Sequence, residues 1–303
     1  MRLRRLPLKG AHPAAWQSQF LGCPGLRPRR FHRMRMINET NPSHTMQDTV
    51  RTPALPESAD AQYAAPRVRQ LREDLALALR AAAHHGLSEG VCNHFSVMLP
   101  GAQDRYLINP RGLHWSEVGP DDIVLIDVRG AVLAGRHRVE PTALFIHGAI
   151  HRITGHAVVL HVHSPYATAL TLTADRALDT TLSQNAMRFM DRLAIDADYN
   201  GLALDDAEGE RIARAMAGKD VAFLANHGVV VAGATIAHAY DDLYYLERAC
   251  LHQVIAQSTG RPLAPVNAAL AARVAAQVQS EREQSDLFFE SLRRMLPAPA
   301  AIR

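Results

Sequence analysis

The chain has 303 residues, of which 48% are hydrophobic, and a formal net charge of +3, so it is long enough to bury one large core. The first 50 residues hold nine Lys and Arg and two acidic residues, which leaves 24 basic and 28 acidic residues in the remainder. A weakly acidic body lacks the clustered positive charge that binds phosphate backbones, and this excludes nucleic-acid binding. The sequence has no run of about 18 apolar residues to span a bilayer, and its three scattered cysteines argue against a disulfide framework. We therefore expect a cytoplasmic protein without a membrane partner.

The N-terminal segment, residues 1–65, mixes Arg, Pro, Gly and Ser without apolar periodicity. Such a segment cannot bury enough apolar surface to offset the entropy lost on ordering, so we expect it to be disordered. Its Arg-rich, acid-poor first half resembles an organelle transit peptide. The simpler interpretation is a gene start placed too early, with Met34, Met36 or Met46 as the initiator. We expect the folded domain over 66–262, and a C-terminal helix and tail at 263–303 that pack on it or on an oligomer.

Helix and strand signals then alternate along the chain. Helices are predicted from apolar residues spaced three and four apart, from prolines at the first helical position and from a glycine after the last turn. These signals predict helices over 67–85, 141–154, 206–217, 236–257 and 267–295, and a further one after Ser164–Pro165. Short apolar or β-branched runs bounded by turn residues predict strands at 94–99, 105–109, 123–127, 157–162, 221–225 and 229–232. Interleaved helices and short strands indicate a mixed sheet covered by helices.

Two histidines stand two residues apart at the end of a predicted strand. His161 and His163 project from the same face of that strand, while Val162 points to the other. A third histidine, His227, lies at another junction between a strand and a turn, beside Gly228, which permits close approach. Three neutral imidazoles leave positions on a metal ion open for water or substrate, as in catalytic metal sites. The opposing interpretation is a chance pair, because the chain has 16 histidines.

A second pair, His147 and His151, stands four residues apart on one face of a predicted helix. It could also chelate a metal ion, but no acidic residue of the HExxH kind lies between its members. We therefore expect packing, or orientation of a neighbouring ligand, from this pair.

The run His-Val-His-Ser-Pro-Tyr at 161–166 and the run Asn-His-Gly at 226–228 resemble the metal-binding core of the class II aldolase and adducin family. The resemblance covers about 68–262 and includes the segments 90–96, 107–112, 123–127 and 239–248. It implies an α/β protein with a three-layer αβα fold and a central mixed, largely antiparallel sheet. It also implies homotetramers with active sites at subunit interfaces, and Zn²⁺, with Mn²⁺ or Fe²⁺ as alternatives, held by His161, His163 and His227.

One catalytic feature of the aldolase branch is altered here. In that branch the metal stabilises the enediolate left by carbon–carbon cleavage, and a glutamate beside the metal moves protons. This chain has Glu-Pro-Thr-Ala at 140–143 where the sugar-phosphate aldolases have Pro-Ser-Ser-Glu, so Ala143 occupies the place of the glutamate. Glu140 lies one helical turn away and is a catalytic candidate only under a different alignment.

The loops that bind phosphate in the aldolases are altered as well. The resemblance gives four candidates for substrate binding: Asn93, Arg111, Gly112 and Thr142. The guanidinium of Arg111 can grip a carboxylate or phosphate with two hydrogen bonds, which implies a small anionic substrate; the alternative is a solvent-facing arginine in a turn. Tyr199 falls where the aldolases place a tyrosine that reaches into the neighbouring subunit's site as an acid. The alternative is a loop tyrosine buried for its ring.

These features favour a metal-dependent carbon–carbon lyase, of aldolase or decarboxylase type, that acts on a small anionic carbonyl or hydroxy-acid substrate through a metal-stabilised enolate. Loss of the glutamate weakens aldol chemistry more than decarboxylation, because release of carbon dioxide needs no base to begin. One alternative is a metal-dependent dehydratase, since a zinc ion on three histidines also acidifies water. The other is a non-catalytic interaction protein of the adducin type. Adducin-like relatives typically lose the metal ligands, whereas all three histidines are present here.

Overall fold

The computed structural model describes residues 58–216, 218–297 and 299. Within them, eight strands form one sheet in the order β4-β3-β2-β1-β5-β8-β7-β6. The strands are β1 (His94–Met98), β2 (Arg105–Ile108), β3 (Val124–Asp127), β4 (Val132–Ala134), β5 (Val158–Val162), β6 (Leu193–Asp196), β7 (Val221–Leu224) and β8 (Gly228–Gly233). In this sheet β6 and β7 pair in parallel and every other neighbouring pair is antiparallel. The prediction of a mixed, largely antiparallel sheet is confirmed.

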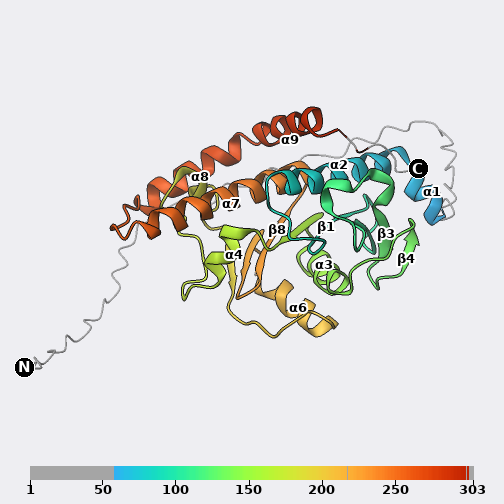
Figure 1. Ribbon diagram of the computed structural model, residues 1–303, viewed down its shortest axis with the longest axis horizontal. Coiled ribbons are helices and arrows are strands. Elements are labelled where there is room, and N and C mark those ends of the chain that lie inside the picture. Colours follow the sequence, from blue (N-terminus) through green and yellow to red (C-terminus); the bar gives the residue numbers. More distant parts are fainter. Residues whose placement is uncertain (1–57, 217, 298, 300–303) are drawn as a thin grey trace, which may run out of the picture. The chain divides into compact units, whose positions relative to one another are not determined.

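Helices cover both faces of the sheet. They are α1 (Ala59–Ala64), α2 (Pro66–His84), α3 (Pro141–Thr154), α4 (Pro165–Thr171), α5 (Gln184–Met187), α6 (Asp206–Ala215), α7 (Ile236–Ser258), α8 (Ala268–Ser280) and α9 (Glu283–Met295). Figure 1 shows α2 and α7 on one side of the strands and α3 and α6 on the other. The fold is therefore the expected three-layer αβα arrangement. Among the described residues, no helix combines the length and hydrophobicity needed to cross a membrane.

The two faces of β1 differ in chemistry, and this difference positions the site. Alternate side chains of a strand point to opposite faces. Phe95 and Val97 lie on the face toward α2 and α7, in the largest core cluster, and full burial of a side chain such as Phe95 contributes about 2 kcal/mol. His94 and Ser96 lie on the other face, where Ser96 contacts α3. The sequence thus leaves polar groups beneath α3 in an otherwise apolar strand.

One short helix lies within the N-terminal segment that we expect to be disordered. Residues 1–57 lie outside the described residues, but the part of the N-terminal segment that follows them forms α1, which we had expected to be disordered. This short helix is held because the Ser58 side chain accepts a hydrogen bond from the Ala61 N–H, at 3.2 Å, and the Tyr63 hydroxyl donates to the Ile123 carbonyl, at 2.6 Å. The ordered domain therefore begins before residue 66.

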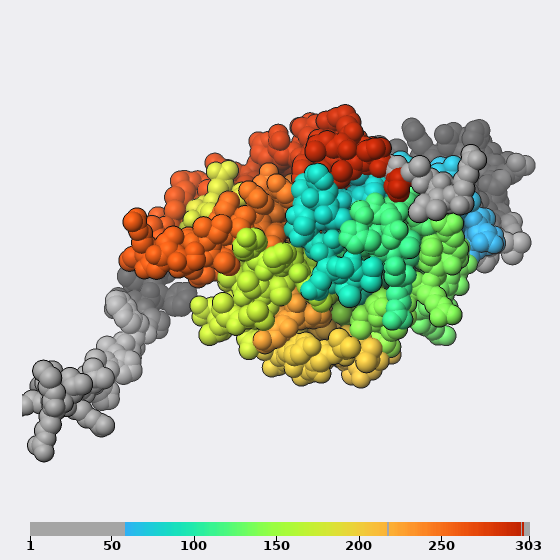
Figure 2. All heavy atoms as spheres, viewed as in Figure 1, coloured from blue at the N-terminus to red at the C-terminus, as the bar shows by residue number. Residues whose placement is uncertain are grey.

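The single helix predicted over 267–295 is two helices, α8 and α9. The chain turns between them, and the Arg282 guanidinium at the turn lies 2.9 Å from a carboxylate oxygen of Asp242 in α7. That ion pair favours the break over a continuous helix, because it draws α9 back onto α7. Figure 2 shows α8 and α9, in orange and red, on the outer surface of the domain. Strands β4 and β6 were not predicted; they are short, and their burial patterns mix exposed and buried residues.

Candidate metal centre

His161 is positioned by β5 and its partner strands. The side chain is 1% exposed and lies on the same face of the strand as Val159, beneath α3 and α6. Its Nδ1 lies 3.1 Å from the Val229 carbonyl oxygen of β8. A carbonyl can only accept, so Nδ1 carries the ring proton and Nε2 keeps a free lone pair. A neutral imidazole in this tautomer is a metal ligand through Nε2.

His163 follows the end of β5 directly, before Ser164 and Pro165 begin α4. Its Nδ1 lies 2.6 Å from a carboxylate oxygen of Glu89, which fixes the proton on Nδ1. The opposite nitrogen, Nε2, is buried and has no hydrogen-bond partner. Glu89 was not identified from the sequence, because it lies in a loop and nothing in its local pattern places it beside His163.

His227 is held by a tight turn between β7 and β8. Asn226 adopts a left-handed conformation with φ 55°, and Gly228 passes close to the end of β5. A Cβ on Gly228 would lie 2.5 Å from the Val162 carbonyl oxygen and 2.7 Å from the His163 ring, so only glycine permits this approach. The turn thereby brings the His227 ring to 4.8 Å from the rings of both His161 and His163, between centroids.

The three predicted ligands converge. One ring nitrogen from each of His161, His163 and His227 lies within 4.8 Å of the others. Burial, with the charge of neighbouring imidazoles, lowers the pKa of His161 well below its usual value and the pKa of His227 to about 4, so both rings are neutral at pH 7. A buried unpaired nitrogen such as His163 Nε2 costs about 1–3 kcal/mol. These residues fit a divalent metal, since an ion would satisfy all three nitrogens.

A cavity of about 380 Å³ opens beside these histidines. The other residues that line it are Val91, Cys92, Asn93, His94, Asn109, Pro110, Arg111, Gly112, Glu140, Thr142, Ile146, Leu202 and Ala203. All four substrate-binding candidates therefore share one cavity with the metal ligands. Asn93 contributes twice, because its side-chain oxygen also accepts the backbone N–H of His163, at 3.3 Å. Most of the lining is apolar surface, which suits a small substrate with few charged groups.

Arg111 and Glu140 form an ion pair at this cavity, with 2.8 Å between Nε and the carboxylate oxygen. Glu140 stands at the N-cap of α3. Ala143, one turn further, is buried among Tyr106, Ile108 and their neighbours and does not line the cavity. The position that carries a glutamate in the aldolases thus has a methyl group here, and the nearby carboxylate of Glu140 is engaged by an arginine.

Tyr199 lies in the loop after β6. Its side chain is 51% exposed, and its ring centroid is 6.2 Å from that of His227 in the same chain. It shares a small hollow with His227 but does not line the larger cavity. The ring is therefore close to the metal ligands and open to a neighbouring molecule.

Three further histidines lie where α3 packs on the sheet: His94 on β1, and His147 and His151 on α3 itself. His94 sits directly opposite His161 in the β1–β5 pairing, and the centroids of the two rings are 5.3 Å apart. Burial lowers the pKa of His94 to about 3. His147 and His151 are both hydrogen-bonded to Ser96, so this pair is packed as we expected. His94 was missed because the strand register was unknown; the alternation of polar residues at 94 and 96 was the available signal.

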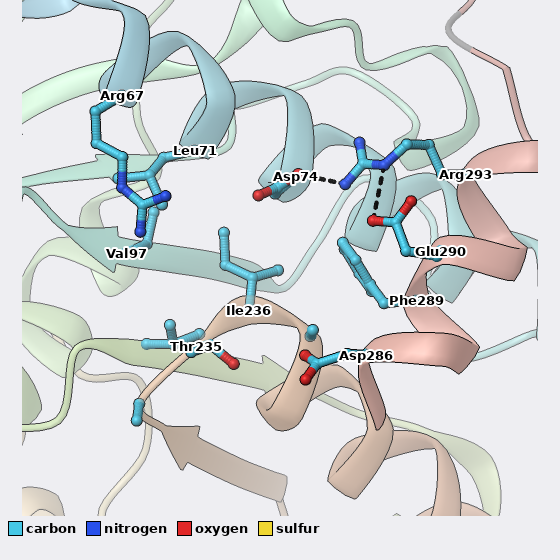
Figure 3. Close-up of a pocket in the computed structure, with 13 residues that line it drawn as sticks. Arg67, Leu71, Asp74, Val97, Thr235, Ile236, Asp286, Phe289, Glu290 and Arg293 are labelled. Atoms are coloured by element: carbon cyan, nitrogen blue, oxygen red, sulfur yellow. Dashed lines mark hydrogen bonds and ion pairs between the residues drawn. The ribbon is translucent and has the colours of Figure 1, made fainter. Parts of the chain in front are cut away.

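A second cavity, of about 260 Å³, lies between α2, the start of α7 and α9 (Figure 3). Its lining contains no histidine or cysteine. Arg293 of α9 reaches Asp74 of α2 at 2.6 Å, and this ion pair attaches α9 to the domain; its second partner, Glu290 at 3.2 Å, lies on α9 itself. The charges of this cavity therefore serve packing, and the candidate site is the cavity beside the metal ligands.

Comparisons with known proteins agree with this architecture. Residues 73–254 match the family model for the class II aldolase and adducin N-terminal domain. A protein from Caulobacter vibrioides named for aldolase class 2 is 35% identical over 63% of this chain and 74% of its own length. The decarboxylase NovR of Streptomyces niveus is 32% identical over 61% of this chain and 70% of its own length.

A solved structure shows the same fold. The aldolase II superfamily protein of Pseudomonas syringae is 30% identical and superposes with a TM-score of 0.72, covering 79% of this chain and 96% of the other. The family model matches more than half of the chain, in the region that carries the sheet and the three histidines. The chain belongs to the class II aldolase and adducin family.

Proposed function

We propose that this protein is a metal-dependent lyase that breaks a carbon–carbon bond beside a carbonyl group in a small anionic substrate. The observation that carries the proposal is the convergence of three imidazoles, one with a buried unpaired Nε2, on one side of a cavity. A divalent cation, when bound, supplies Lewis-acid chemistry: it draws electron density from a substrate carbonyl and offsets the negative charge that develops as the bond breaks. We infer Zn²⁺, which three histidines suit, with Mn²⁺ or Fe²⁺ as alternatives.

The other residues of the site orient the histidine rings and bind the substrate. Glu89 and the Val229 carbonyl hold the His163 and His161 rings in the tautomer that leaves Nε2 free. Arg111 offers a guanidinium at the cavity to a substrate carboxylate or phosphate, in competition with Glu140. Thr142 and Asn93 add polar groups to the lining of the same cavity, and Leu202 and Ala203 add apolar surface to it.

Two reactions fit this site. Decarboxylation is supported by the methyl group of Ala143, since loss of carbon dioxide needs no base to begin, and by the relative named as a decarboxylase. Retro-aldol cleavage needs a group that moves a proton, and Tyr199 is the candidate from the sequence. Because Tyr199 is half exposed and lies near His227, we infer that it meets a neighbouring subunit in a homotetramer.

Elemental analysis of the purified full-length protein tests the proposal. We expect about one zinc, manganese or iron ion per chain in the wild type, and less than a tenth of that in a His161→Ala, His163→Ala double variant. The matched control is a His114→Ala, His252→Ala double variant, which removes two exposed histidines from outside the cavity and should keep the metal. Circular dichroism confirms that each variant is folded.

A metal-free wild type, even after reconstitution with all three ions, overturns the lyase proposal and favours a non-catalytic interaction protein of the adducin type. If the metal is present, keto and hydroxy acids are incubated with the loaded protein. Release of carbon dioxide identifies decarboxylation, release of an aldehyde identifies retro-aldol cleavage, and loss of water without either product identifies the dehydratase alternative.

A further inference from the structure

The cavity beside the metal ligands has an apolar part that the proposed function does not yet use. This apolar part consists of side chains from the loop before β1, the loop after β2, helix α3 and the loop after β6: Val91, Pro110, Ile146, Leu202 and Ala203. Ile146 and Ala203 are buried, whereas Val91 and Leu202 are 49% and 69% exposed. Two apolar side chains are thus open to water at the cavity, where a bound molecule can cover them.

The polar groups of the same cavity are mostly engaged by the protein itself. The Asn109 side chain is bonded to two backbone groups at the start of β1: its oxygen accepts an N–H at 2.8 Å, and its nitrogen donates to a carbonyl at 3.3 Å. The side-chain oxygen of Asn93 accepts the backbone N–H that follows β5, and Glu140 is paired with Nε of Arg111. Beside the metal ligands, the groups left for a bound molecule among the described residues are mainly the amide nitrogen of Asn93, the Thr142 hydroxyl and the terminal nitrogens of Arg111.

This shortage of free hydrogen-bonding groups discriminates between classes of substrate. A sugar chain carries a hydroxyl on nearly every carbon, and each hydroxyl placed against Ile146, Ala203 or Leu202 would exchange water for an apolar wall. A hydrocarbon chain gains from the same exchange, because it removes the exposed surface of Val91 and Leu202 from water together with its own. A single anionic group still finds the terminal nitrogens of Arg111. The cavity therefore favours a molecule that is anionic at one end and apolar elsewhere.

We infer that the substrate of this site is an oxo acid or hydroxy acid with a hydrocarbon side chain, aliphatic or aromatic, and not a sugar phosphate; this inference rests on the proposed lyase function. The carboxylate lies at Arg111, and the carbonyl or hydroxyl oxygen lies on the side of the three histidines. The hydrocarbon chain packs against Val91, Ile146, Leu202 and Ala203. These four side chains set the specificity of the site without contact with the bond that breaks.

The volume of the cavity agrees with such a molecule. At about 30 Å³ for each water-sized group, a cavity of about 380 Å³ holds about twelve non-hydrogen atoms. Pyruvate fills roughly half of this space and leaves the apolar part uncovered, whereas 2-oxooctanoate or phenylpyruvate fills nearly all of it. The longer acids therefore make apolar contacts that pyruvate lacks.

Binding of a series of 2-oxo acids to full-length, zinc-loaded protein tests this inference. Full burial of a methylene group strengthens binding about fourfold, and partial exposure beside Leu202 reduces this gain to about two- to threefold. We therefore expect the Kd from NMR titration to fall about 100-fold between pyruvate and 2-oxooctanoate. Dihydroxyacetone phosphate has a carbonyl, a hydroxyl and a phosphate group but no hydrocarbon chain, and it should bind at least about tenfold more weakly than 2-oxooctanoate.

Two leucines in one loop separate binding in this cavity from binding to apolar surface in general. Leu202→Asn places an amide in the apolar part, and we expect it to weaken binding of 2-oxooctanoate about tenfold and to change the Kd of pyruvate by less than about twofold. Leu204→Asn is the matched control, because Leu204 is also exposed but does not line the cavity, and it should bind both acids like the wild type. Val91→Asn alters the apolar part from another segment and should behave like Leu202→Asn.

The outcomes distinguish this inference from the proposed function. A wild type that holds no metal overturns the lyase function itself. A zinc-loaded wild type that binds all the 2-oxo acids equally, or binds dihydroxyacetone phosphate more tightly than 2-oxooctanoate, overturns the substrate class and leaves the metal site standing. A gain with chain length that persists in both Leu202→Asn and Val91→Asn overturns the placement of the hydrocarbon chain in this cavity.

Discussion

Two groups of histidines lie within one domain and do different things. In the metal-centre cluster, His161, His163 and His227, the outer nitrogens of two rings are held by Val229 and Glu89, and the inner ones converge beside a cavity. In the α3 cluster, His147 and His151, the Ser96 hydroxyl fills the space between the rings. What a group of histidines can bind therefore depends on the hydrogen-bond partners of its ring nitrogens. Substitutions in either cluster can test this difference.

Acid should produce the largest effect, through the buried histidines. Burial lowers the pKa of His151 to about 4 and that of His94 to about 3, so the folded protein disfavours the proton that the unfolded chain binds near pH 6.5. Their contribution to stability is complete above pH 6.5 and is lost as the pH falls toward 4. Each of these two histidines costs about 2 kcal/mol between pH 7 and pH 5, so together they should lower the free energy of unfolding of metal-free protein by about 4 kcal/mol. The pKa values of His147, His161 and His227 are lowered in the same direction and add to this loss.

Urea unfolding at the two pH values measures this loss. A His151→Gln variant keeps a polar side chain for Ser96 but has no group that titrates, and its loss should be smaller than that of the wild type by about 2 kcal/mol. Equal losses in the two proteins would mean that His151 is not responsible. Zinc-loaded wild type should lose more than metal-free protein over the same range, because protons also compete with the metal for its ligands.

Removal of the Ser96 hydroxyl breaks both hydrogen bonds of the α3 cluster and leaves the metal ligands unchanged. Ser96→Ala leaves His147 Nδ1 and His151 Nε2 buried without their partner. Each unsatisfied group costs about 1–3 kcal/mol, so we expect the free energy of unfolding to fall by about 3 kcal/mol in urea, at unchanged zinc content. Ser116→Ala, at an exposed serine, is the control and should change stability little. Loss of zinc from Ser96→Ala would show that the two clusters act as one.

Glu89→Gln addresses the other cluster. A glutamine side chain can still accept a hydrogen bond from His163 Nδ1–H, but without the negative charge that makes the ring a stronger ligand. We expect zinc affinity to fall by about 10- to 100-fold in competition with a chelating dye, with little change in the unfolding of metal-free protein, because the Glu89 side chain is 60% exposed. The control is Glu117→Gln, at an exposed glutamate that accepts from the His114 backbone. Equal zinc affinities in Glu89→Gln and the control would show that Glu89 does not strengthen metal binding by His163.

The sequence predicted the ligands of the metal-centre cluster better than their surroundings. A strand with histidines two apart and a turn with Asn-His-Gly are local patterns, and the structure brings His161, His163 and His227 together. Glu89 reaches the site through the conformation of its loop, which no local pattern encodes. The alternation of polar residues at 94 and 96 marks His94 as unusual, but only the antiparallel register places it opposite His161. The helix break at 281–282 was missed for the same reason, since the Arg282–Asp242 ion pair joins residues 40 positions apart.

The smallest effect on stability is expected at the ion pair of Arg111 and Glu140, which belongs to neither cluster. The side chains are 57% and 34% exposed, and such pairs contribute less than about 1 kcal/mol, so Arg111→Gln and Glu140→Gln should both unfold nearly as the wild type does. Their effects on anion binding should have opposite signs. Arg111→Gln removes the guanidinium, and we expect the Kd of pyruvate for zinc-loaded protein, from NMR titration, to rise about tenfold. Glu140→Gln frees that guanidinium from its competitor, so the same Kd should fall. Two changes in the same direction, or none, would make Arg111 a solvent-facing turn residue and would place anion recognition on the histidine side of the cavity.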